Sequence, residues 1–296
     1  MKTLTVFTPT YNRAYCLRAL YESLCAQTNK DFEWLIVDDG SSDNTRELVQ
    51  AFIEENKIQI KYHAQTNSGK HVAHNKGVEL CETELFVCVD SDDALTANAV
   101  DVILHKYEAV KNQKILGLYL RKQYPDGRWM ASAYPKGIEK IGITDLYHNY
   151  PFTGDTVIVL KTELIKPYSF PVFEGERFVT EKVLYNQLNH IAPMLLCDEA
   201  IYTAEYLPDG YTKNIQKLIA NNPQGVAVDC LFESFYHTRL LERLKGYAQY
   251  RAVVNTFKLK KETFKKYNKA SFLVKAGAWL LMPHYLRLYK RLGENK

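Results

Sequence analysis

The segment ELFVCVDSDD (residues 84–93) decides the fold, because it joins a short apolar run to three carboxylates within four residues. Apolar runs of this length, bounded by polar residues, are typical of buried strands. Two earlier segments have the same build, LTVFTPTYNR (residues 4–13) and FEWLIVDDGSSD (residues 32–43). In all three, polar side chains follow directly after a predicted strand.

Segments with helical periodicity separate these strands. Helices are predicted after residues 14 and 45, and over 70–80, 97–109 and 176–190. Further strands are predicted over 58–63, 115–120 and 156–161, with a strand pair or one extended strand over 194–206. Alternation of this kind is typical of an α/β domain with a mostly parallel sheet. We therefore predict such a domain over residues 1–210 and a helical, basic region over 211–296.

Ligands of an open α/β sheet bind outside the carboxyl ends of its strands, so the polar clusters are expected to converge there. Asp38 and Asp39 are adjacent carboxylates, whose repulsion needs a donor or a cation to offset it. The carboxylates of residues 90–93 raise the same problem more strongly. A hard divalent cation, Mn²⁺ or Mg²⁺, would resolve it with oxygen ligands. The alternative for each cluster is an ordinary helix cap, with acidic groups near the helix dipole.

The motifs PTYNR (9–13), VDDGSSDNT (37–45) and VDSDD (89–93), in this order, resemble those of glycosyltransferase family 2. The resemblance covers about residues 3–210 and implies a GT-A fold, with the DXD motif at Asp90 and Asp92. It implies an inverting transfer of a sugar from a nucleotide-sugar donor, usually a uridine diphosphate (UDP) sugar, to a hydroxyl acceptor.

The resemblance also implies roles for individual residues. Tyr11 covers the base in the nucleoside pocket, Asp39 hydrogen-bonds the base, and Asp92 ligates the metal together with Asp90. The full set implied at the donor is Thr8, Pro9, Tyr11, Arg13, Asp39, Lys70, Asp90, Ser91 and Asp92.

The segment NSGKHVAHNKG (67–77) lies where the family often has an arginine. His74 stands at that position, so Lys70 or His71 is expected to contact the diphosphate. The alternative is a plain helix start after a loop. A helix N-terminus would itself favour phosphate.

An inverting transfer needs a general base beside the acceptor hydroxyl. The family often places it in a Glu-Asp pair at the start of a helix, and GERFVTEKVL (175–184) resembles that region. Glu181 is therefore the predicted base, with Lys182 where the family has Asp and with Asp155 as the next choice. The alternative for Glu181 is a carboxylate favoured by the helix dipole.

Two rival functions remain open. A nucleotidyltransferase shares the carboxylate–metal–nucleotide logic, but TPTYNR lacks the glycine-rich basic loop expected after its first strand. The second rival is a non-catalytic nucleotide-sugar or glycan-binding module that has lost the base, and the departure at Lys182 keeps it as an alternative. No GxGxxG follows the first strand, which disfavours a dinucleotide-binding dehydrogenase.

The C-terminal region is strongly basic. Residues 239–296 hold 15 Lys or Arg and 3 Asp or Glu, while the rest of the chain carries a net charge of −8. Aromatic and aliphatic residues are interleaved, as in helices that lie on anionic lipid. The alternative is a helical appendage that packs on the core or on another subunit. We do not expect nucleic-acid binding.

Localisation follows from several absences in the sequence. No stretch of about 18 apolar residues could span a bilayer, no secretory signal precedes the first strand, and the six cysteines suggest reduced thiols. We expect a cytoplasmic protein, peripheral on the inner face of the cell membrane, with a glycan or lipid-linked glycan acceptor. A turn at 207–212 is expected to close over the diphosphate.

Overall fold

The computed structural model describes residues 2–204 and 215–294, and the chain divides into two compact units. Unit 1 comprises Met1–Ser169 and Leu188–Glu205, and unit 2 comprises Phe170–Gln187 and Tyr206–Lys296. The predicted turn at 207–212 and the predicted boundary at residue 210 lie outside the described residues.

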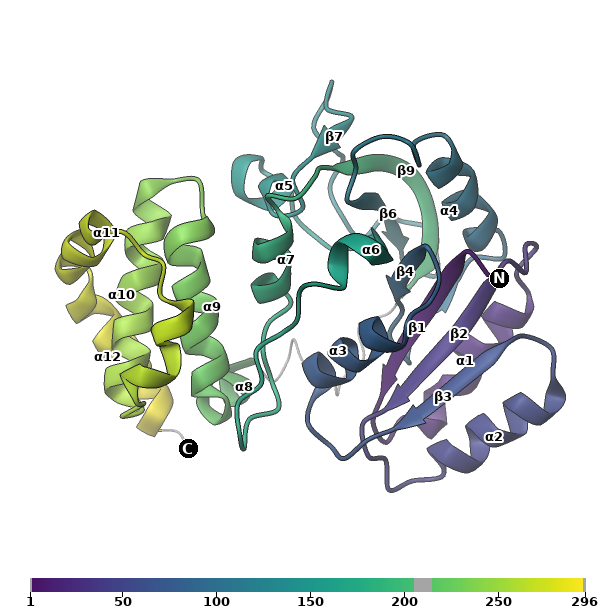
Figure 1. The fold of residues 1–296 in the computed structure, drawn as a ribbon, viewed down its shortest axis with the longest axis horizontal. Helices are drawn as coiled ribbons and strands as arrows, with labels where there is room; N and C mark the ends of the chain where they lie inside the picture. Colours follow the sequence, from purple (N-terminus) through teal and green to yellow (C-terminus); the bar gives the residue numbers. More distant parts are fainter. Residues whose placement is uncertain (1, 205–214, 295–296) are drawn as a thin grey trace. The chain divides into compact units, whose positions relative to one another are not determined.

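Unit 1 is built on a mixed sheet (Figure 1). Its strands are β1 (Leu4–Thr10), β2 (Phe32–Asp38), β3 (Ile60–Ala64), β4 (Leu85–Cys88), β5 (Ala94–Leu95), β6 (Gly117–Gln123), β7 (Lys140–Ile141), β8 (Thr156–Lys161) and β9 (Met194–Thr203). Over the described residues their order is β3-β2-β1-β4-β8-β6-β9-β5, with β7 paired to β9.

The first four strands in that order run parallel, which confirms the predicted α/β class. β8 is antiparallel to both of its neighbours, β4 and β6, and β6 is parallel to β9. β4 and β6 therefore point the same way, and their carboxyl ends lie at the same edge of the sheet as those of β1 and β2.

Helices cover both faces of this sheet (Figure 1). They are α1 (Ala14–Cys25), α2 (Thr45–Glu55), α3 (Lys70–Leu80), α4 (Ala99–Glu108), α5 (Asp145–Asn149) and α6 (Thr162–Ile165). α1, α2 and α4 share one buried apolar cluster with the strands. α3 packs on the other face, where Gly77 lies so close to the Phe7 ring that a Cβ would come within 2.4 Å of it.

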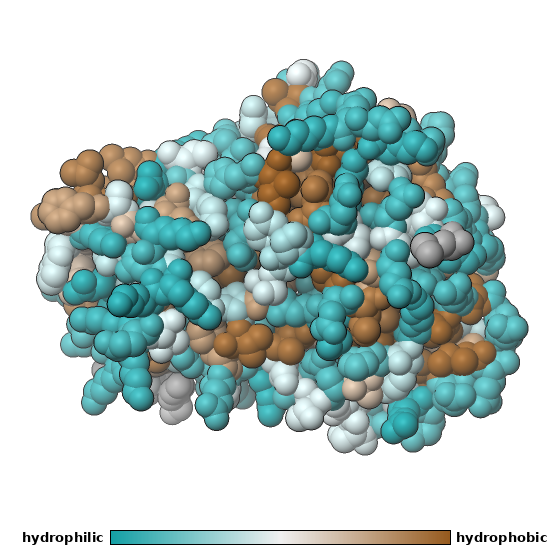
Figure 2. All heavy atoms as spheres, viewed as in Figure 1, coloured by the Kyte–Doolittle hydropathy of each residue, from teal (hydrophilic) through white to brown (hydrophobic). Residues whose placement is uncertain are grey.

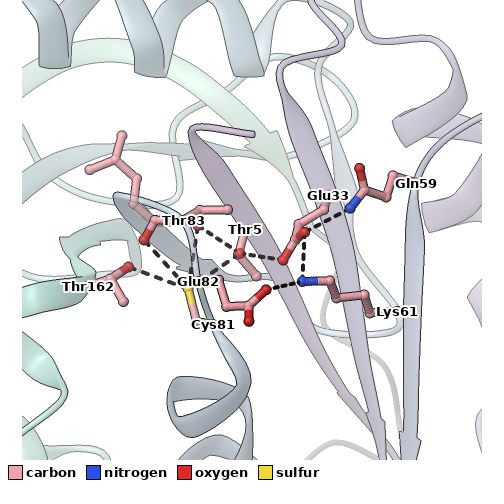
Figure 3. A network of polar contacts seen from close by, with 9 residues as sticks. Thr5, Glu33, Gln59, Lys61, Cys81, Glu82, Thr83 and Thr162 are labelled. Atoms are coloured by element: carbon pink, nitrogen blue, oxygen red, sulfur yellow. Dashed lines mark hydrogen bonds and ion pairs between the residues drawn. The ribbon is translucent and has the colours of Figure 1, made fainter. Parts of the chain in front are cut away.

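The amino-terminal edge of the sheet is closed by buried polar groups that bond to one another (Figure 3). Glu33 accepts hydrogen bonds from Thr5 (3.2 Å) and Gln59 (3.0 Å) and pairs with Lys61 at 3.1 Å. Cys81 lies within 3.4 Å of the hydroxyls of Thr5, Thr83 and Thr162. This edge uses its polar groups internally, which leaves the carboxyl edge as the place for ligands.

Unit 2 is helical over its described residues. Its helices are α7 (Lys182–Leu188), which ends at the border with unit 1, α8 (Ile215–Asn221), α9 (Pro223–Tyr236), α10 (Leu240–Thr256), η2 (Lys261–Tyr267), α11 (Phe272–Gly277), η3 (Ala278–Leu280) and α12 (Met282–Glu294). α9 and α10 pack closely at Gly246, where a Cβ would come within 2.8 Å of the Cys230 carbonyl oxygen. Among the described helices, none is long and apolar enough to cross a bilayer.

The helix predicted over 176–190 is shorter in the structure, because Glu176, at its predicted start, binds the start of another helix instead. The Glu176 carboxylate accepts the backbone N–H groups of Gln224 (2.7 Å) and Gly225 (2.8 Å) and so caps the start of α9. The helix itself begins only at Lys182. The region over 194–203 is one strand, β9.

Candidate active site

The three polar clusters converge, as the sequence predicted. β1 lies between β2 and β4 in parallel register, with Thr10 opposite Asp38 and Phe7 opposite Cys88. The segments that follow these strands therefore leave the sheet side by side.

In the segment after β1, only some side chains reach the surface. Thr8 and Pro9 are buried in the strand, and the Thr8 hydroxyl accepts a hydrogen bond from the Trp34 indole (2.9 Å). Tyr11 is 47% exposed. Asn12, with a φ of 52°, turns the chain and accepts the backbone N–H of Ser42 at 2.7 Å, which ties the first two segments together.

The adjacent carboxylates at the end of β2 both accept hydrogen bonds. Asp38 accepts from the Tyr62 hydroxyl (2.6 Å) and the Ser41 N–H (2.8 Å). Asp39 is buried and accepts from the Gln65 amide (2.7 Å) and from two backbone N–H groups just before α3, at residues 68 (2.9 Å) and 69 (2.7 Å). Asp39 therefore also fixes the start of α3.

The Asp43 carboxylate accepts hydrogen bonds at the start of two helices, α1 and α2. Its carboxylate accepts the N–H of Ala14, the first residue of α1, at 3.1 Å, as well as the N–H of Thr45 (3.1 Å). Burial would raise the pKa of Asp43, but these hydrogen bonds and that of the Thr45 hydroxyl outweigh it and lower the pKa.

Cations of the chain face all three carboxylates of the turn after β4. Lys70 pairs with Asp90 at 2.8 Å and Arg13 with Asp92 at 3.6 Å. The third, Asp93, has the Lys122 ammonium 4.0 Å away. The repulsion from which the sequence argued for a metal is thus already offset by side chains.

Tyr202, a buried residue of β9, holds this turn in place. Its hydroxyl accepts the N–H of Asp90 (3.0 Å) and donates to the Asp93 carboxylate (2.7 Å). The Lys122 ammonium lies 4.2 Å from the centre of its ring. The sequence did not predict Tyr202 or Lys122, and its only signal was a lysine just past the predicted strand 115–120.

The pKa values of the turn differ with the neighbours of each group. Burial would raise the pKa of Asp90, but the charges of Lys70 and Lys122 outweigh it and hold that pKa below its usual value. Burial raises the pKa of Asp93 to about 6, with Lys122 opposing the shift and Asp90 adding to it. Ser91 is buried between them.

The start of α3 carries one charged side chain and two neutral ones. Lys70 begins the helix after Gly69, whose φ is 99°. Burial lowers the pKa of His71 to about 4 and that of His74 to about 3, and His74 lies edge-on against the rings of Phe7 and Phe86. Both histidines are neutral near pH 7, so Lys70 is the cation of this turn that can meet a diphosphate.

The carboxylates of Asp90 and Asp92 fit a divalent cation. Their side chains are 37% and 22% exposed, and they offer the oxygen ligands that Mn²⁺ and Mg²⁺ prefer. Their present partners, Lys70 and Arg13, are long side chains that can move aside. Asp93 is more buried and is engaged by Tyr202.

Glu181 belongs to unit 2 and occupies the cap position of α7. It is exposed, and its carbonyl oxygen accepts the N–H groups of Leu184 (3.0 Å) and Tyr185 (3.1 Å). Lys182 lies 3.3 Å from Glu233 of α9. Burial would lower the pKa of Lys182, but the charges of Asp229 and Glu233 outweigh it and raise the pKa. The lysine that departs from the family pattern thus serves the packing of α7 on α9.

Comparison with known proteins agrees with this geometry. The family model Glycosyl transferase family 2 matches residues 5–168. Glycosyltransferase GlyG of Streptococcus pneumoniae is 26% identical over 196 residues, which cover 62% of this chain and 64% of GlyG. The Escherichia coli protein WfgD, a UDP-Glc:alpha-D-GlcNAc-diphosphoundecaprenol beta-1,3-glucosyltransferase, is 26% identical over 188 residues, covering 59% of this chain and 66% of WfgD.

Solved structures share the fold. Staphylococcus aureus TarS 1–349 in complex with UDP-GlcNAc superposes with a TM-score of 0.63 at 17% identity, covering 99% of this chain and 91% of that one. The mannosyltransferase PcManGT of Pyrobaculum calidifontis, in complex with GDP-Man and Mn²⁺, gives a TM-score of 0.53 at 17% identity, covering 98% and 84%. These likenesses bear out the GT-A architecture predicted for the chain.

Proposed function

The chain belongs to glycosyltransferase family 2, and from that premise we propose that it transfers a sugar, with inversion, from a UDP-sugar to a glycan or lipid-linked glycan in cell-surface polysaccharide synthesis. The observation that carries the proposal is the convergence of three polar segments on the carboxyl edge of the sheet. The activity for which WfgD is named and the UDP-GlcNAc bound to TarS support the choice of donor and acceptor.

Donor binding is assigned to the carboxyl edge. The exposed Tyr11 ring covers the base, and Asp39 reads it with the lone pair of Oδ2 that remains beside the three hydrogen bonds accepted within the chain. Lys70, which now pairs with Asp90 at 2.8 Å, turns to the diphosphate when the donor enters. Thr8 and Pro9 are buried and fix the position of the end of β1. Arg13 and Ser91 complete the group of residues proposed to bind the donor.

Asp92 and Asp90 would hold Mn²⁺ or Mg²⁺. Such an ion supplies Lewis acidity at the diphosphate, which stabilises the charge of the leaving group. The chain's own contribution is to fix the turn that carries both carboxylates, through the hydroxyl of Tyr202.

Glu181 is assigned as the general base. Its carboxylate, exposed at the start of α7, would take the proton of the acceptor hydroxyl while the oxygen of that hydroxyl attacks the anomeric carbon. The bond to the diphosphate breaks as the new glycosidic bond forms, so the configuration at that carbon inverts.

Unit 2 is assigned a place on the inner face of the cell membrane. Residues 263–293 hold seven Lys or Arg and no Asp or Glu. Four apolar side chains of α11 and η3 are strongly exposed: Phe272 (81%), Leu273 (76%), Trp279 (59%) and Leu280 (87%). Figure 2 shows apolar side chains gathered over α11, with hydrophilic ones around them. Exposed apolar groups among positive charges fit an anionic lipid surface.

UDP release from a panel of UDP-sugars, measured with and without Mn²⁺, tests the enzymatic proposal. The wild type should release UDP only with metal, and Asp92→Asn should nearly abolish release. Asp101→Asn, which alters an exposed carboxylate of α4, is the matched control and should behave as wild type. Full activity in chelator, or unchanged activity of Asp92→Asn, would reject the DXD assignment.

The same assay separates the rival functions. Release of pyrophosphate from a nucleoside triphosphate and a sugar phosphate would favour a nucleotidyltransferase. Thermal stabilisation by nucleotide sugars without any turnover would favour a binding module.

A further inference from the structure

Unit 1 exposes a tryptophan at the edge of the sheet that carries the donor residues. Trp129 is 47% exposed. It stands opposite Gln123, the last residue of β6, across a tight turn in which Tyr124 donates its N–H to the carbonyl of Arg128 (2.8 Å). The exposure of so large an aromatic side chain in a short hairpin has to be explained.

The inner face of the indole rests on a fixed cation. The guanidinium of Arg121, a fully buried residue, lies 4.5 Å from the centre of the Trp129 ring and 3.5 Å from that of Tyr134. It donates to Asp198 (2.7 and 3.2 Å) and to the carbonyl of Ser132 (2.6 Å). Because the guanidinium is held from several sides, the indole above it is pre-organised and loses little freedom when its outer face is covered.

The position of this ring relates it to the donor residues. β6 runs parallel to β4, so residues 124–131 leave the sheet at the edge where the turn of residues 90–93 lies. The Lys122 ammonium, from the end of the same strand, is 4.0 Å from Asp93. The hairpin that carries Trp129 therefore leaves the sheet at the same edge as the turn of residues 90–93, within unit 1.

The segment that follows Trp129 pairs with the residues that precede β8. Ala131 pairs with Gly154, and Ser132 donates its N–H to the carbonyl of Thr153 at 2.9 Å. This pairing brings the segment after Trp129 alongside the residues that enter β8, where Asp155 is exposed. An aromatic face and a carboxylate therefore flank the same edge.

We propose that Trp129 and Asp155 form a subsite for a pyranose ring of the acceptor, an inference that rests on the proposed function. The C–H face of the sugar covers the outer face of the indole, and Asp155 accepts hydrogen bonds from its hydroxyls. A pyranose has the matching chemistry, because one face is apolar and its rim is polar. Lipid fits poorly, because the neighbours Asp126, Arg128 and Asp198 are charged and exposed.

Saturation-transfer NMR with methyl glycosides of glucose, galactose and N-acetylglucosamine tests the subsite. The wild type should transfer saturation to the ring protons of at least one of them at up to about 50 mM. Trp129→Ala should lower that signal at least about fivefold, whereas Trp129→Phe, which keeps an aromatic face, should retain most of it. Asp155→Asn should weaken binding by about three- to tenfold.

The matched control is Trp279→Ala, which removes an exposed tryptophan of unit 2 and should leave the signal unchanged. Circular dichroism checks that each variant folds. Equal signals from wild type and Trp129→Ala, or no binding of any of the three glycosides by the wild type, would overturn the subsite.

UDP release from the donor into water separates this inference from the proposed function. Trp129→Ala should release UDP without acceptor as fast as wild type, because the indole is not part of the donor set. If the wild type releases UDP but shows no Trp129-dependent binding, the subsite fails and the function stands. If glycosides bind through Trp129 and no nucleotide sugar is turned over, the proposed function fails and the binding site stands.

Discussion

Trp129 of unit 1 and Trp279 of unit 2 are both exposed, and each lies over an arginine. The ring centres are 4.5 Å from the Arg121 guanidinium and 5.2 Å from the Arg251 guanidinium. Their surroundings differ. Trp129 stands among exposed charged groups of both signs, whereas Trp279 has three further exposed apolar residues in α11 and η3 and only basic charges in residues 263–293.

Exposure of an aromatic ring does not identify its ligand, whereas the chemistry of the neighbouring residues does. A single exposed aromatic ring that packs on a fixed arginine and is flanked by a carboxylate suits a small polar ligand with one apolar face. Several apolar groups among positive charges suit a broad anionic surface. On this basis we assign carbohydrate to the edge of unit 1 and membrane to the tail of unit 2.

The strongest loss of activity is expected from a change to the proposed base, which belongs to unit 2, so it tests whether that unit serves only the membrane. Glu181→Gln keeps the shape and removes the basicity, so it should slow acceptor-dependent transfer by about 10²–10⁴-fold. Donor affinity should change little. The measurement is steady-state transfer to acceptor together with UDP binding.

Glu176→Gln is the control for Glu181→Gln. It changes a neighbouring carboxylate that caps α9, so it should alter stability more than rate. A near-normal rate of Glu181→Gln would move the base to another carboxylate, with Asp155 next.

The second prediction concerns vesicles that contain anionic lipid. Replacing Trp279 and Leu280 together by Ala should weaken binding by about 10–100-fold, because each residue loses part of the free energy of burying apolar surface. High salt should release the wild type, since the charges are then screened. Co-sedimentation with vesicles measures both effects.

Trp129→Ala is the control in the vesicle assay and should bind like wild type. If the wild type ignores anionic vesicles at low salt, the tail packs on protein instead, and the lipid-linked acceptor loses its main support. Truncation after residue 256 is the blunter test, because it also uncovers α10, on which Gly277 and Trp279 pack.

The third prediction concerns donor binding by unit 1. Asp39→Ala should weaken UDP binding by about 1–3 kcal/mol, the cost of leaving a hydrogen-bond partner unsatisfied. Tyr62→Phe removes a hydrogen bond from the adjacent carboxylate, Asp38, and should leave UDP affinity near normal. Isothermal titration calorimetry compares the two. Equal losses would mean that Asp39 acts only by anchoring the start of α3.

The smallest effect concerns acid sensitivity in unit 1. Burial lowers the pKa of His74 to about 3, so the folded state holds this ring neutral while the unfolded chain takes up a proton near pH 6.5. Stability is therefore fully present above pH 6.5 and falls as the pH drops toward 3. From pH 7 to pH 5 the loss due to this group should be about 1–2 kcal/mol.

Urea unfolding at pH 7 and pH 5 measures this term. His74→Gln should lose less stability than wild type over that interval, and His105→Gln, at an exposed position of α4, should lose as much as wild type. An equal loss in wild type and His74→Gln would show that the ring does not set the acid response.

Local patterns in the sequence predicted much of the fold and the outline of the site. The strands, the helix over 70–80 and the clusters at the strand ends depend on near neighbours, and each is present. Tyr202 and Trp129 depend on pairing between β6, β9 and a hairpin, which no local pattern encodes. Helix α7 begins late because Glu176 is recruited by α9, a tertiary contact that overrides the helical pattern.

The charges that surround residues 90–93 could not be predicted for the same reason. The carboxylates at residues 90–93 are mutually repulsive only if no other charge is near. Arg13, Lys70 and Lys122 come from three distant segments and supply that charge. The positions of these three cations depend on the fold. The sequence therefore predicted the three carboxylates but not the cations that pair with them.

The closed amino-terminal edge of the sheet gives the protein an intrinsic reporter of its own opening. Cys81 is fully buried among hydroxyl groups there, and Cys230 is buried in unit 2. A thiol reagent can reach either sulfur only when the surrounding structure opens. In two variants that each retain only one of the six cysteines, Cys81 or Cys230, the labelling rate would report the opening of each unit separately, without denaturant or an attached dye.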